Sequence, residues 1–316
     1  MIEMKKCKIL VSWKVGEEFK RILLNELKNC EIEFARSLNE RDLCKAIKDK
    51  HILIAGICTE RMIKNAEKLE LIHSMIKSVN RINLNLAKER GIKVTNTVGY
   101  CGDSVAEFII GIMIMLSRDL SFFLNRKINK QKWSLNFKGF ELKGKTLGII
   151  GLGEIGCALA KRAKCMGMKI YGIDIVPSLR LKLDFVGGKE SLNYVLKNSD
   201  FISINLHRTP ETINFMTLKH FKIMKKTAFY IDTSRGGITN FEDLYKALKR
   251  GYIKGAFLDV FPKEPPDYSH PVFKLKNFYF SPHIAGVTKE AEIKSAEYTA
   301  GIIKRFLQRK RINSII

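Results

Sequence analysis

The sequence predicts an α/β protein with two parallel β-sheets, and three observations lead to that class. Short apolar runs alternate with amphipathic segments over the first hundred residues, a glycine-rich turn follows an apolar run near residue 150, and a second alternation continues from there. Buried strands of a parallel sheet are continuous apolar runs, and the connections between them are helices. A chain of 316 residues is long enough for two such domains.

The first alternation runs from residue 8 to residue 96. Each predicted strand is a short apolar run, and each predicted helix carries apolar residues at helical spacing. Strands are expected at 8–11, 52–55, 71–76 and 94–96, and helices at 17–27 and 60–66.

A longer helix is expected next, from Asp103 through Met115, with Asp103 or Ser104 as its N-cap. Its apolar stretch, 105–116, is too short to span a bilayer and contains Glu107, which favours a buried or interface helix. A polar arm containing Trp133 follows.

The second alternation begins at residue 146 and contains the remaining apolar runs. Strands are expected at 146–150, 169–173, 201–205, 228–231, 256–258 and 278–280, with a helix at 155–166 and a final helix at 289–308. All seven prolines lie at or beyond Pro177, mostly in predicted loops of this part.

The final helix determines the predicted domain organisation. Its apolar stripe needs a partner, and packing on the first unit would make that domain discontinuous. We therefore expect two Rossmann-like or flavodoxin-like βα domains, one comprising 1–98 plus 286–316 and the other 99–285 inserted within it. A cleft between two such domains is a common ligand site.

Composition narrows the class of protein. The net charge of +24 comes from lysines spread along the whole chain, so we expect a basic surface that attracts anionic ligands rather than a nucleic-acid partner. The seven cysteines form no CxxC pair, which indicates reduced thiols and no metal site. The chain start lacks the pattern of a signal peptide, so a soluble, cytoplasmic protein without membrane attachment is expected.

A phosphate-binding loop is predicted where the second alternation begins. In GLGEIG, Gly151 permits a tight turn, Gly153 lets the backbone approach a pyrophosphate, and Gly156 lets helix and strand pack closely. The helix that begins at Glu154 and Ile155 would direct its free N–H groups toward the phosphates. This motif is typical of dinucleotide binding when a strand precedes it and a helix follows.

An acidic residue supports the same interpretation. Asp174 ends the next predicted strand, about twenty residues beyond the glycines, where a carboxylate accepts hydrogen bonds from an adenosine ribose. A carboxylate repels a 2′-phosphate and no arginine follows immediately, so NAD is favoured over NADP as the cofactor.

Three chemically useful side chains follow three of the later apolar runs. They are Arg235 in TSRGG, Glu264 in DVFPKEPP and His283 in SPHIAG. Parallel strands bring their carboxyl ends to one edge of a sheet, so these side chains are expected to gather there. Together they could bind an anion and move a proton.

These segments resemble the D-isomer-specific 2-hydroxyacid dehydrogenases over nearly the whole chain. The matching stretches include NLAKERGIKVTNTVGY, SVAEFIIGIMIMLSR, LKGKTLGIIGLGEIG, TAFYIDTSRGG, GAFLDVFPKEPP and SPHIAG. The resemblance implies that Arg235 binds the substrate carboxylate and polarises the 2-oxo group, because a guanidinium is always charged and can bind in two-pronged fashion. His283 would donate or accept the proton, and Glu264 would hold the imidazole and favour its charged form.

Further roles are implied for the cofactor pocket. Asp259 matches the residue that holds the nicotinamide carboxamide, and Thr233, Ser234 and Arg235 lie where the family lines the NAD pocket. Of the other histidines, His207 is expected to be structural or to line the adenosine side, and the rest to be structural: His51, His73, His220 and His270.

The predicted substrate loop departs most from the family pattern. Lys77, Ser78 and Val79 lie where backbone N–H groups contact the substrate carboxylate in relatives, but Ser78 replaces a common glycine. Lys77 could add a second cation for a doubly charged substrate, or be a solvated lysine. Substrates implied by the resemblance are phosphoglycerate, glycerate, glyoxylate or hydroxypyruvate.

Two other functions stay open on the sequence. Relatives of this fold include NAD(H)-sensing corepressors, and a lysine like Lys77 occurs in phosphite dehydrogenase. The resemblance also implies a homodimer formed through the helix at 105–116 and the arm with Trp133.

Overall fold

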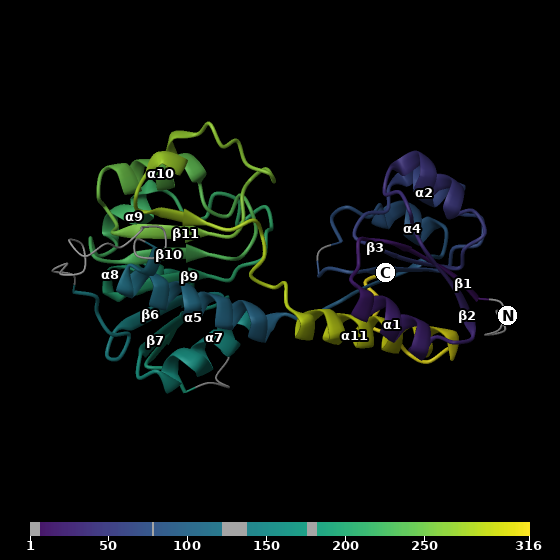
Figure 1. The fold of residues 1–316 in the computed structure, drawn as a ribbon, viewed down its shortest axis with the longest axis horizontal. Helices are drawn as coiled ribbons and strands as arrows, with labels where there is room; N and C mark the ends of the chain where they lie inside the picture. Colours follow the sequence, from purple (N-terminus) through teal and green to yellow (C-terminus); the bar gives the residue numbers. More distant parts are fainter. Residues whose placement is uncertain (1–6, 78, 122–137, 176–181) are drawn as a thin grey trace, which may run out of the picture. The chain divides into compact units, whose positions relative to one another are not determined.

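The computed structural model describes residues 7–77, 79–121, 138–175 and 182–316 (Figure 1). The chain divides into two compact units, residues 1–100 with 288–316, and residues 101–287. Each unit contains one β-sheet in which every pair of neighbouring strands is parallel, which confirms the predicted α/β class. No helix in these described stretches combines the length and the apolar character needed to cross a membrane.

The first unit is a five-stranded sheet with the order β2-β1-β3-β4-β5. Its strands are β1 (Cys7–Ser12), β2 (Cys30–Phe34), β3 (Ile52–Ala55), β4 (Leu71–Ser74) and β5 (Lys93–Asn96). Its helices are α1 (Glu17–Glu26), α2 (Glu40–Ala46), α3 (Glu60–Asn65), α4 (Leu84–Glu89) and α11 (Lys289–Leu307).

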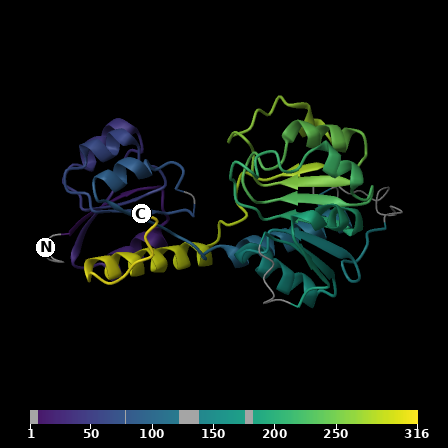
Figure 2. The ribbon, with the colours of Figure 1, turned by 180° about the vertical axis from the view of Figure 1, so that it is seen from behind.

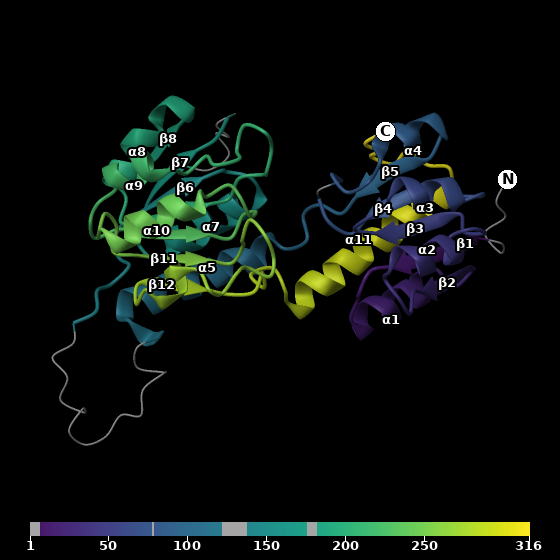
Figure 3. The ribbon, with the colours of Figure 1, turned by 90° about the horizontal axis from the view of Figure 1, so that it is seen from above.

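The last helix completes the first unit, although it is far away in sequence. Helix α11 packs beside α1 and contributes Ala296, Ala300 and Ile303 to the core on that face of the sheet (Figures 1 and 3). The yellow helix lies along the purple and blue elements in the rear view as well (Figure 2). Helices α2, α3 and α4 cover the opposite face, so both faces of this sheet are buried.

The second unit is a seven-stranded sheet with the order β12-β11-β10-β9-β6-β7-β8. Its strands are β6 (Thr146–Ile150), β7 (Lys169–Ile173), β8 (Phe185–Gly187), β9 (Phe201–Ile204), β10 (Phe229–Asp232), β11 (Gly255–Leu258) and β12 (Phe278–Phe280). Its helices are α5 (Gly102–Arg118), α7 (Glu154–Cys165), α8 (Leu192–Asn198), α9 (Leu218–Ile223) and α10 (Phe241–Lys249), with 3₁₀ turns η3 (Lys189–Ser191) and η4 (Pro271–Lys274).

The strand order places a ligand site. The chain runs outward from β6 through β7 to β8, then returns to add β9 on the other side of β6. Ligands of open α/β sheets bind at the carboxyl edge where the order reverses, here between β6 and β9. Helices α5 and α7 cover one face of this sheet and α8, α9 and α10 the other, so the edge is the part of the sheet left for a ligand.

The N-cap predicted for one helix was wrong, and the sequence prediction missed the strands β2 and β8. The long helix α5 begins at Gly102, and its N-cap is Cys101 without a side-chain hydrogen bond, rather than Asp103 or Ser104. Strand β2 was not predicted, because its residues Cys30–Phe34 alternate between half-buried and exposed instead of forming an apolar run. This alternation is that of an edge strand, which has one partner and a solvated side.

Candidate active site

The glycine loop joins β6 to α7 in a conformation that requires glycine at two positions. Gly151 has a φ of +100°, and a Cβ atom there would lie 2.7 Å from the carbonyl oxygen of Asn205. A Cβ atom on Gly156 would lie 2.0 Å from the carbonyl oxygen of Gly151. A Cβ atom on Gly153 would meet nothing within 4 Å, so open space lies in front of the first turn of α7. A pyrophosphate needs both that space and the free N–H groups of the helix start.

The side chain of Asp174 is hydrogen-bonded to the backbone of this glycine loop. Its Oδ2 accepts a hydrogen bond of 2.7 Å from the Leu152 N–H, and its Oδ1 accepts one of 2.7 Å from the Ile175 N–H. The carboxylate therefore lies at the end of β7 beside the glycine turn. Glu154 has a different partner, because its Oε1 accepts a hydrogen bond from the Gly102 N–H at the start of α5. Ile155 packs against the core beneath the same helix.

Two polar atoms without protein partners lie on the same edge. Within the described residues, four buried side-chain polar atoms lack a hydrogen-bond partner, and two of them are Asn205 Oδ1 and Thr233 Oγ1. These residues follow β9 and β10 directly. Buried polar groups in native proteins are nearly always paired, so these two atoms are positioned for a bound polar molecule. The open glycine loop, Asp174 and these two atoms together fit a dinucleotide.

His283 and Glu264 form a hydrogen-bonded dyad. Nδ1 of His283 lies 2.8 Å from Oε2 of Glu264, and both side chains are partly exposed, 45% and 39% respectively. The other carboxylate oxygen, Oε1, accepts a hydrogen bond of 3.1 Å from the Phe261 N–H. A carboxylate acceptor requires the proton on Nδ1, which assigns Nε2 to proton exchange with a ligand.

A cavity of ≈ 200 Å³ adjoins this dyad. His283 and Glu264 both line this cavity, and most of the other lining residues are aromatic residues and prolines. These other residues are Phe261, Pro265, Pro266, Tyr268, Phe280, Ser281 and Pro282. The dyad is thus accessible on a largely apolar surface, where a charge–charge interaction is screened less than in bulk water.

The loop that carries His283 is held by Asp259. This carboxylate is 1% exposed and accepts hydrogen bonds from Ser281 Oγ (2.5 Å), Ile284 N (2.8 Å) and Ala285 N (2.9 Å). His283 itself has a φ of +57°, a left-handed conformation that costs free energy for a residue with a Cβ atom. The three bonds on both sides of His283 stabilise that conformation.

Arg235 lies in the loop after β10, on the same edge. Its side chain is half-buried, and Nη1 donates a hydrogen bond of 2.7 Å to the Ser234 carbonyl oxygen. The preceding strand ends in Asp232, which sequence reasoning missed. Burial raises the pKa of Asp232. Hydrogen bonds from Ser234 and Thr239 lower this pKa, but the effect of burial is larger. The available signal was an acidic residue ending an apolar run, as at Asp174.

The remaining predicted site residues lie elsewhere in the fold. Lys77 is exposed in the first unit, where its carbonyl oxygen accepts a hydrogen bond from Asn96 Nδ2 of 2.6 Å. Val79 is half-buried near it in sequence, and Ser78 lies outside the described residues. No group of three His, Cys, Asp or Glu side chains in the described segments could hold a metal ion.

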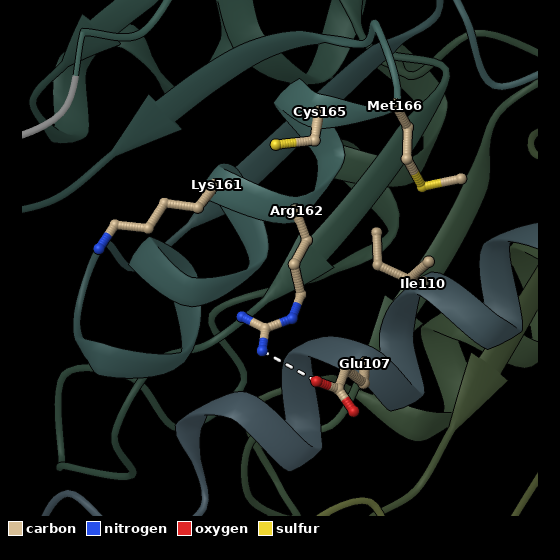
Figure 4. Close-up of a pocket in the computed structure, with 6 residues that line it drawn as sticks. All are labelled: Glu107, Ile110, Lys161, Arg162, Cys165 and Met166. Atoms are coloured by element: carbon tan, nitrogen blue, oxygen red, sulfur yellow. Dashed lines mark hydrogen bonds and ion pairs between the residues drawn. The ribbon is translucent and has the colours of Figure 1, made fainter.

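A second and larger cavity, of ≈ 420 Å³, lies between α5 and α7 (Figure 4). Arg162 projects into it and binds Asp103 at 3.0 Å and Glu107 at 2.9 Å. Its lining residues on α7, from Lys161 onward, belong to the second half of that helix, whereas the glycine loop precedes the first turn. This cavity is therefore separate from the glycine loop and from the dyad.

Four histidines have structural partners, as the sequence predicted. His51 Nδ1 accepts a hydrogen bond from the Lys8 N–H, and His220 closes a capping box with Thr217. His270 pairs with Glu242 at 2.7 Å. His73 is completely buried, and its ring nitrogens bond to threonine hydroxyls.

Comparison with known proteins agrees with this arrangement. Residues 110–285 match the family model for the NAD binding domain of D-isomer specific 2-hydroxyacid dehydrogenases. The chain is 35% identical over 314 residues to D-3-phosphoglycerate dehydrogenase of Methanocaldococcus jannaschii, covering 98% of this chain and 59% of that protein. It therefore spans about three-fifths of that relative. It is 39% identical over 259 residues to glyoxylate reductase of Thermococcus litoralis, covering 78% of this chain and 77% of the relative.

Solved structures show the same fold. A crystal structure of D-lactate dehydrogenase from Aquifex aeolicus, complexed with NAD and lactic acid, matches with a TM-score of 0.80, 26% identity and 96% of each chain covered. A family protein from Aeromonas salmonicida matches with a TM-score of 0.86 and 27% identity over 99% of each chain. The family match covers more than half of the chain, and the relatives extend it to nearly the whole length. The chain belongs to the D-isomer specific 2-hydroxyacid dehydrogenase family.

Proposed function

We propose that this protein is an NAD-dependent oxidoreductase that interconverts a small D-2-hydroxy acid and its 2-oxo acid. The observation that carries the proposal is the hydrogen-bonded dyad of His283 and Glu264, at the sheet edge that also carries Arg235 and the glycine loop. The crystallised relative from Aquifex aeolicus, a D-lactate dehydrogenase with NAD and lactic acid bound, supports the same assignment.

Arg235 would hold the acid group of the substrate. A guanidinium binds a carboxylate through two parallel hydrogen bonds, and the same cation polarises a neighbouring 2-oxo group. Because Arg235 is half-buried, its attraction for an anion is screened less than at an exposed position. The substrate is thereby oriented with its C2 oxygen available to an acid.

His283 would supply that acid. In reduction, Nε2 donates a proton to the C2 oxygen, and in oxidation it removes the proton from the hydroxyl group. Glu264 bonds to Nδ1 and stabilises the imidazolium while the proton is held. The ring also keeps one orientation, because Glu264 is itself anchored to the Phe261 N–H.

The cofactor would be held by the carboxyl edge. The glycine loop and the start of α7 accommodate its pyrophosphate, and Asp174 accepts the adenosine ribose hydroxyls. Thr233, Ser234, Asn205 and Asp259 would line the nicotinamide end. When bound, NAD carries the hydride that C2 of the substrate gains or loses.

The substrate is expected to be a small anion. Relatives named D-3-phosphoglycerate dehydrogenase and glyoxylate reductase make phosphoglycerate, glycerate, hydroxypyruvate and glyoxylate the first compounds to assay. A role for Lys77 in binding a second negative charge stays a prediction. If it holds, Lys77→Met raises the KM for phosphorylated substrates and leaves that for glyoxylate unchanged.

The deciding experiment is an NADH-oxidation screen over 2-oxo acids with the wild type, Arg235→Ala and His283→Ala. The wild type should turn over at least one compound, and each variant should lose at least ~100-fold in kcat/KM while still binding NADH. Undiminished turnover in either variant would exclude the assigned role. Phosphite-dependent NAD reduction, or NADH binding without turnover of any 2-oxo acid, would favour the alternative functions.

A homodimer formed through α5 is part of this proposal; the arm with Trp133, which was also expected to take part, lies outside the described residues. The homodimer follows from the family resemblance, and Ile114 on α5, which is 37% exposed, is an apolar side chain available for burial against a second copy. Light scattering should report a dimer, and Ile114→Glu should shift it toward the monomer. A wild-type monomer at micromolar concentration would exclude the assignment.

A further inference from the structure

Asp232 lies between the sheet and the Arg235 loop, and nothing so far explains its presence there. It is the last residue of β10, and it is 1% exposed. The hydrogen bonds of its carboxylate are directed forward into the loop. Oδ1 accepts from the Ser234 N–H at 2.9 Å and from the Ser234 hydroxyl, and Oδ2 accepts from the Thr239 hydroxyl at 2.5 Å.

These bonds lie on both sides of Arg235. Ser234 precedes the arginine, and Thr239 follows it after the turn through Gly236 and Gly237. A single buried carboxylate therefore fixes both ends of the short loop. The Tyr230 hydroxyl, 2.6 Å from the Thr239 hydroxyl, extends the same network into the core.

The middle of the loop is packed against the neighbouring strand end. A Cβ atom on Gly236 would lie 1.8 Å from the Phe261 carbonyl oxygen, so the backbone there is in close contact with the segment after β11. The loop cannot shift toward that segment, and Asp232 holds it from the other side. Arg235 is thus fixed through its backbone as well as through its side-chain bond to the Ser234 carbonyl oxygen.

The next strand repeats the arrangement for the histidine. Asp259 follows β11, is equally buried, and bonds to residues on both sides of His283. The two acids are joined directly, since the Asp259 N–H donates to the Asp232 carbonyl oxygen at 2.9 Å. Arg235 and His283 are therefore each carried by a loop whose two ends are bound by one buried carboxyl group.

We propose that Asp232 is a positioning residue: its buried carboxyl group fixes the 233–239 loop and thereby the place of Arg235, as Asp259 does for the loop of His283. The proposal rests on the function proposed above for Arg235. Asp232 acts through Ser234 and Thr239 and does not itself touch the substrate, so its removal should weaken substrate binding more than cofactor binding.

The chemistry of the site predicts which substitution is tolerated. Burial, and then the negative charge of Asp259, raise the pKa of Asp232, so a neutral side chain suits the position. Asparagine has the same shape. Its oxygen can accept from Ser234, and its amide can donate to the Thr239 hydroxyl. Alanine provides neither contact.

The test compares Asp232→Asn and Asp232→Ala with a matched control, Asp200→Ala. Asp200 accepts bonds from Thr146 N (2.9 Å) and Lys225 Nζ (2.8 Å) at the amino edge of the same sheet, so its loss perturbs the fold without touching the loop. The first readout is hydrogen–deuterium exchange of peptides covering 233–239 in the full chain. Exchange there should accelerate at least ~10-fold in Asp232→Ala only.

The second readout is the kinetics of 2-oxo acid reduction. Asp232→Ala should raise the KM for the 2-oxo acid at least ~10-fold. The dissociation constant of NADH should rise less than that KM, because the glycine loop and Asp174 hold the other end of the cofactor. Asp232→Asn should restore the wild-type KM. Should Asp232→Ala not fold, Thr239→Val removes one bond at nearly constant volume and should show the same pattern at smaller size.

Two results would overturn the proposal. One is wild-type exchange over 233–239 in a folded Asp232→Ala or Thr239→Val variant. The other is an equal rise in KM for Asp232→Asn and Asp232→Ala, which would mean that the charge rather than the contacts matters. The exchange readout needs no turnover, so a wild type that reduces no 2-oxo acid would count against the proposed function and leave the positioning claim to be decided by exchange.

Discussion

Oε2 of Glu264 lies 2.8 Å from Nδ1 of His283, and the same carboxylate accepts the Phe261 N–H through its other oxygen. Because the Glu264 carboxylate is bound through both oxygens, it cannot rotate freely. It therefore fixes the plane of the His283 ring and also stabilises the positive charge of the imidazolium. Glu264→Gln keeps an acceptor of the same shape but removes the negative charge. The imidazolium needed as proton donor loses its ion pair, whereas the neutral imidazole needed as acceptor does not.

Glu264→Gln should therefore impair reduction more than oxidation at the same pH. We expect kcat for reduction to fall ~10- to 100-fold, which is less than the full ~10²- to 10⁴-fold contribution of general acid catalysis because His283 itself remains. Initial rates in both directions check this. Glu242→Gln is the control, because Glu242 forms a comparable pair with His270 at 2.7 Å in the solvent-exposed part of the same unit. Equal losses in the two directions would contradict the role given to the charge.

Substitutions at three glycines distinguish an effect on folding from an effect on cofactor binding. Gly156→Ala places a methyl group 2.0 Å from a backbone carbonyl oxygen and should cost about 2 kcal/mol or more of stability. Gly153→Ala meets no protein atom within 4 Å and should fold normally, but its methyl group occupies the space proposed for the pyrophosphate. Its affinity for NADH should fall at least ~10-fold.

Gly301→Ala is the matched control for both variants. Gly301 lies in α11 of the first unit, and an added Cβ atom there would meet nothing within 4 Å, so the helix should gain about 1 kcal/mol. Thermal unfolding and NADH titration measure the two properties. Normal NADH affinity in Gly153→Ala would place the pyrophosphate elsewhere.

Asp174 offers a test of cofactor choice. Asp174→Ala removes an acceptor for the ribose hydroxyls, so the affinity for NADH should fall. It also removes the repulsion of a 2′-phosphate, so the ratio of NADPH affinity to NADH affinity should rise. Asp184→Ala is the control, since Asp184 accepts the Ile170 N–H at 2.8 Å at the opposite end of β7. Fluorescence titration with both nucleotides gives the ratio. An unchanged ratio in Asp174→Ala would show that another residue sets the preference.

Much of this site was predictable because its residues follow strands that are apolar runs. Gly151, Asp174, Arg235 and His283 each follow or end such a run, and parallel strands bring those ends together. Sequence spacing alone thus placed them on one edge. The pairing of His283 with Glu264 depended on the family resemblance, since the two belong to different loops.

The roles of other residues depended on contacts that form only when the chain folds. Asp232 was overlooked because its partners, Ser234 and Thr239, are ordinary loop residues until the chain folds back over the carboxylate. The N-cap of α5 was misassigned because Cys101 caps without a side-chain bond, whereas the sequence contains two good capping residues just beyond it. In both cases tertiary contacts outweighed local preference.

His73 makes the stability of the first unit depend on pH. It lies in β4 with no exposed surface, and it bonds to the hydroxyls of Thr95 (2.8 Å), Thr97 (3.0 Å) and Thr299 (3.2 Å), so it links the sheet to α11. Burial lowers the pKa of His73 to about 4. The ring is therefore neutral in the folded protein at any pH above that value.

The direction of the change in stability with pH depends on whether the folded or the unfolded state binds a proton at His73 more readily. In the unfolded chain a histidine has a pKa of about 6.5, so between 6.5 and 4 the unfolded state binds the proton and the folded state does not. The stabilisation is complete above pH 6.5 and is lost as pH falls. Between pH 6.5 and pH 5 the loss should be about 2 kcal/mol, at 1.36 kcal/mol per pH unit.

Urea unfolding of the wild type and His73→Gln at pH 7 and pH 5 measures this. The variant should be less stable at pH 7, because the glutamine cannot reproduce all three threonine contacts, but it should lose less on acidification. Paired carboxylates also make stability depend on pH; hydrogen bonds from Lys8 and Lys50, for example, lower the pKa of Asp49 to about 2. These carboxylates are present in both proteins, so their contributions cancel in the difference between the two. Parallel pH dependences for the two proteins would show that His73 stays protonated, or becomes so without unfolding, and would contradict a neutral buried imidazole.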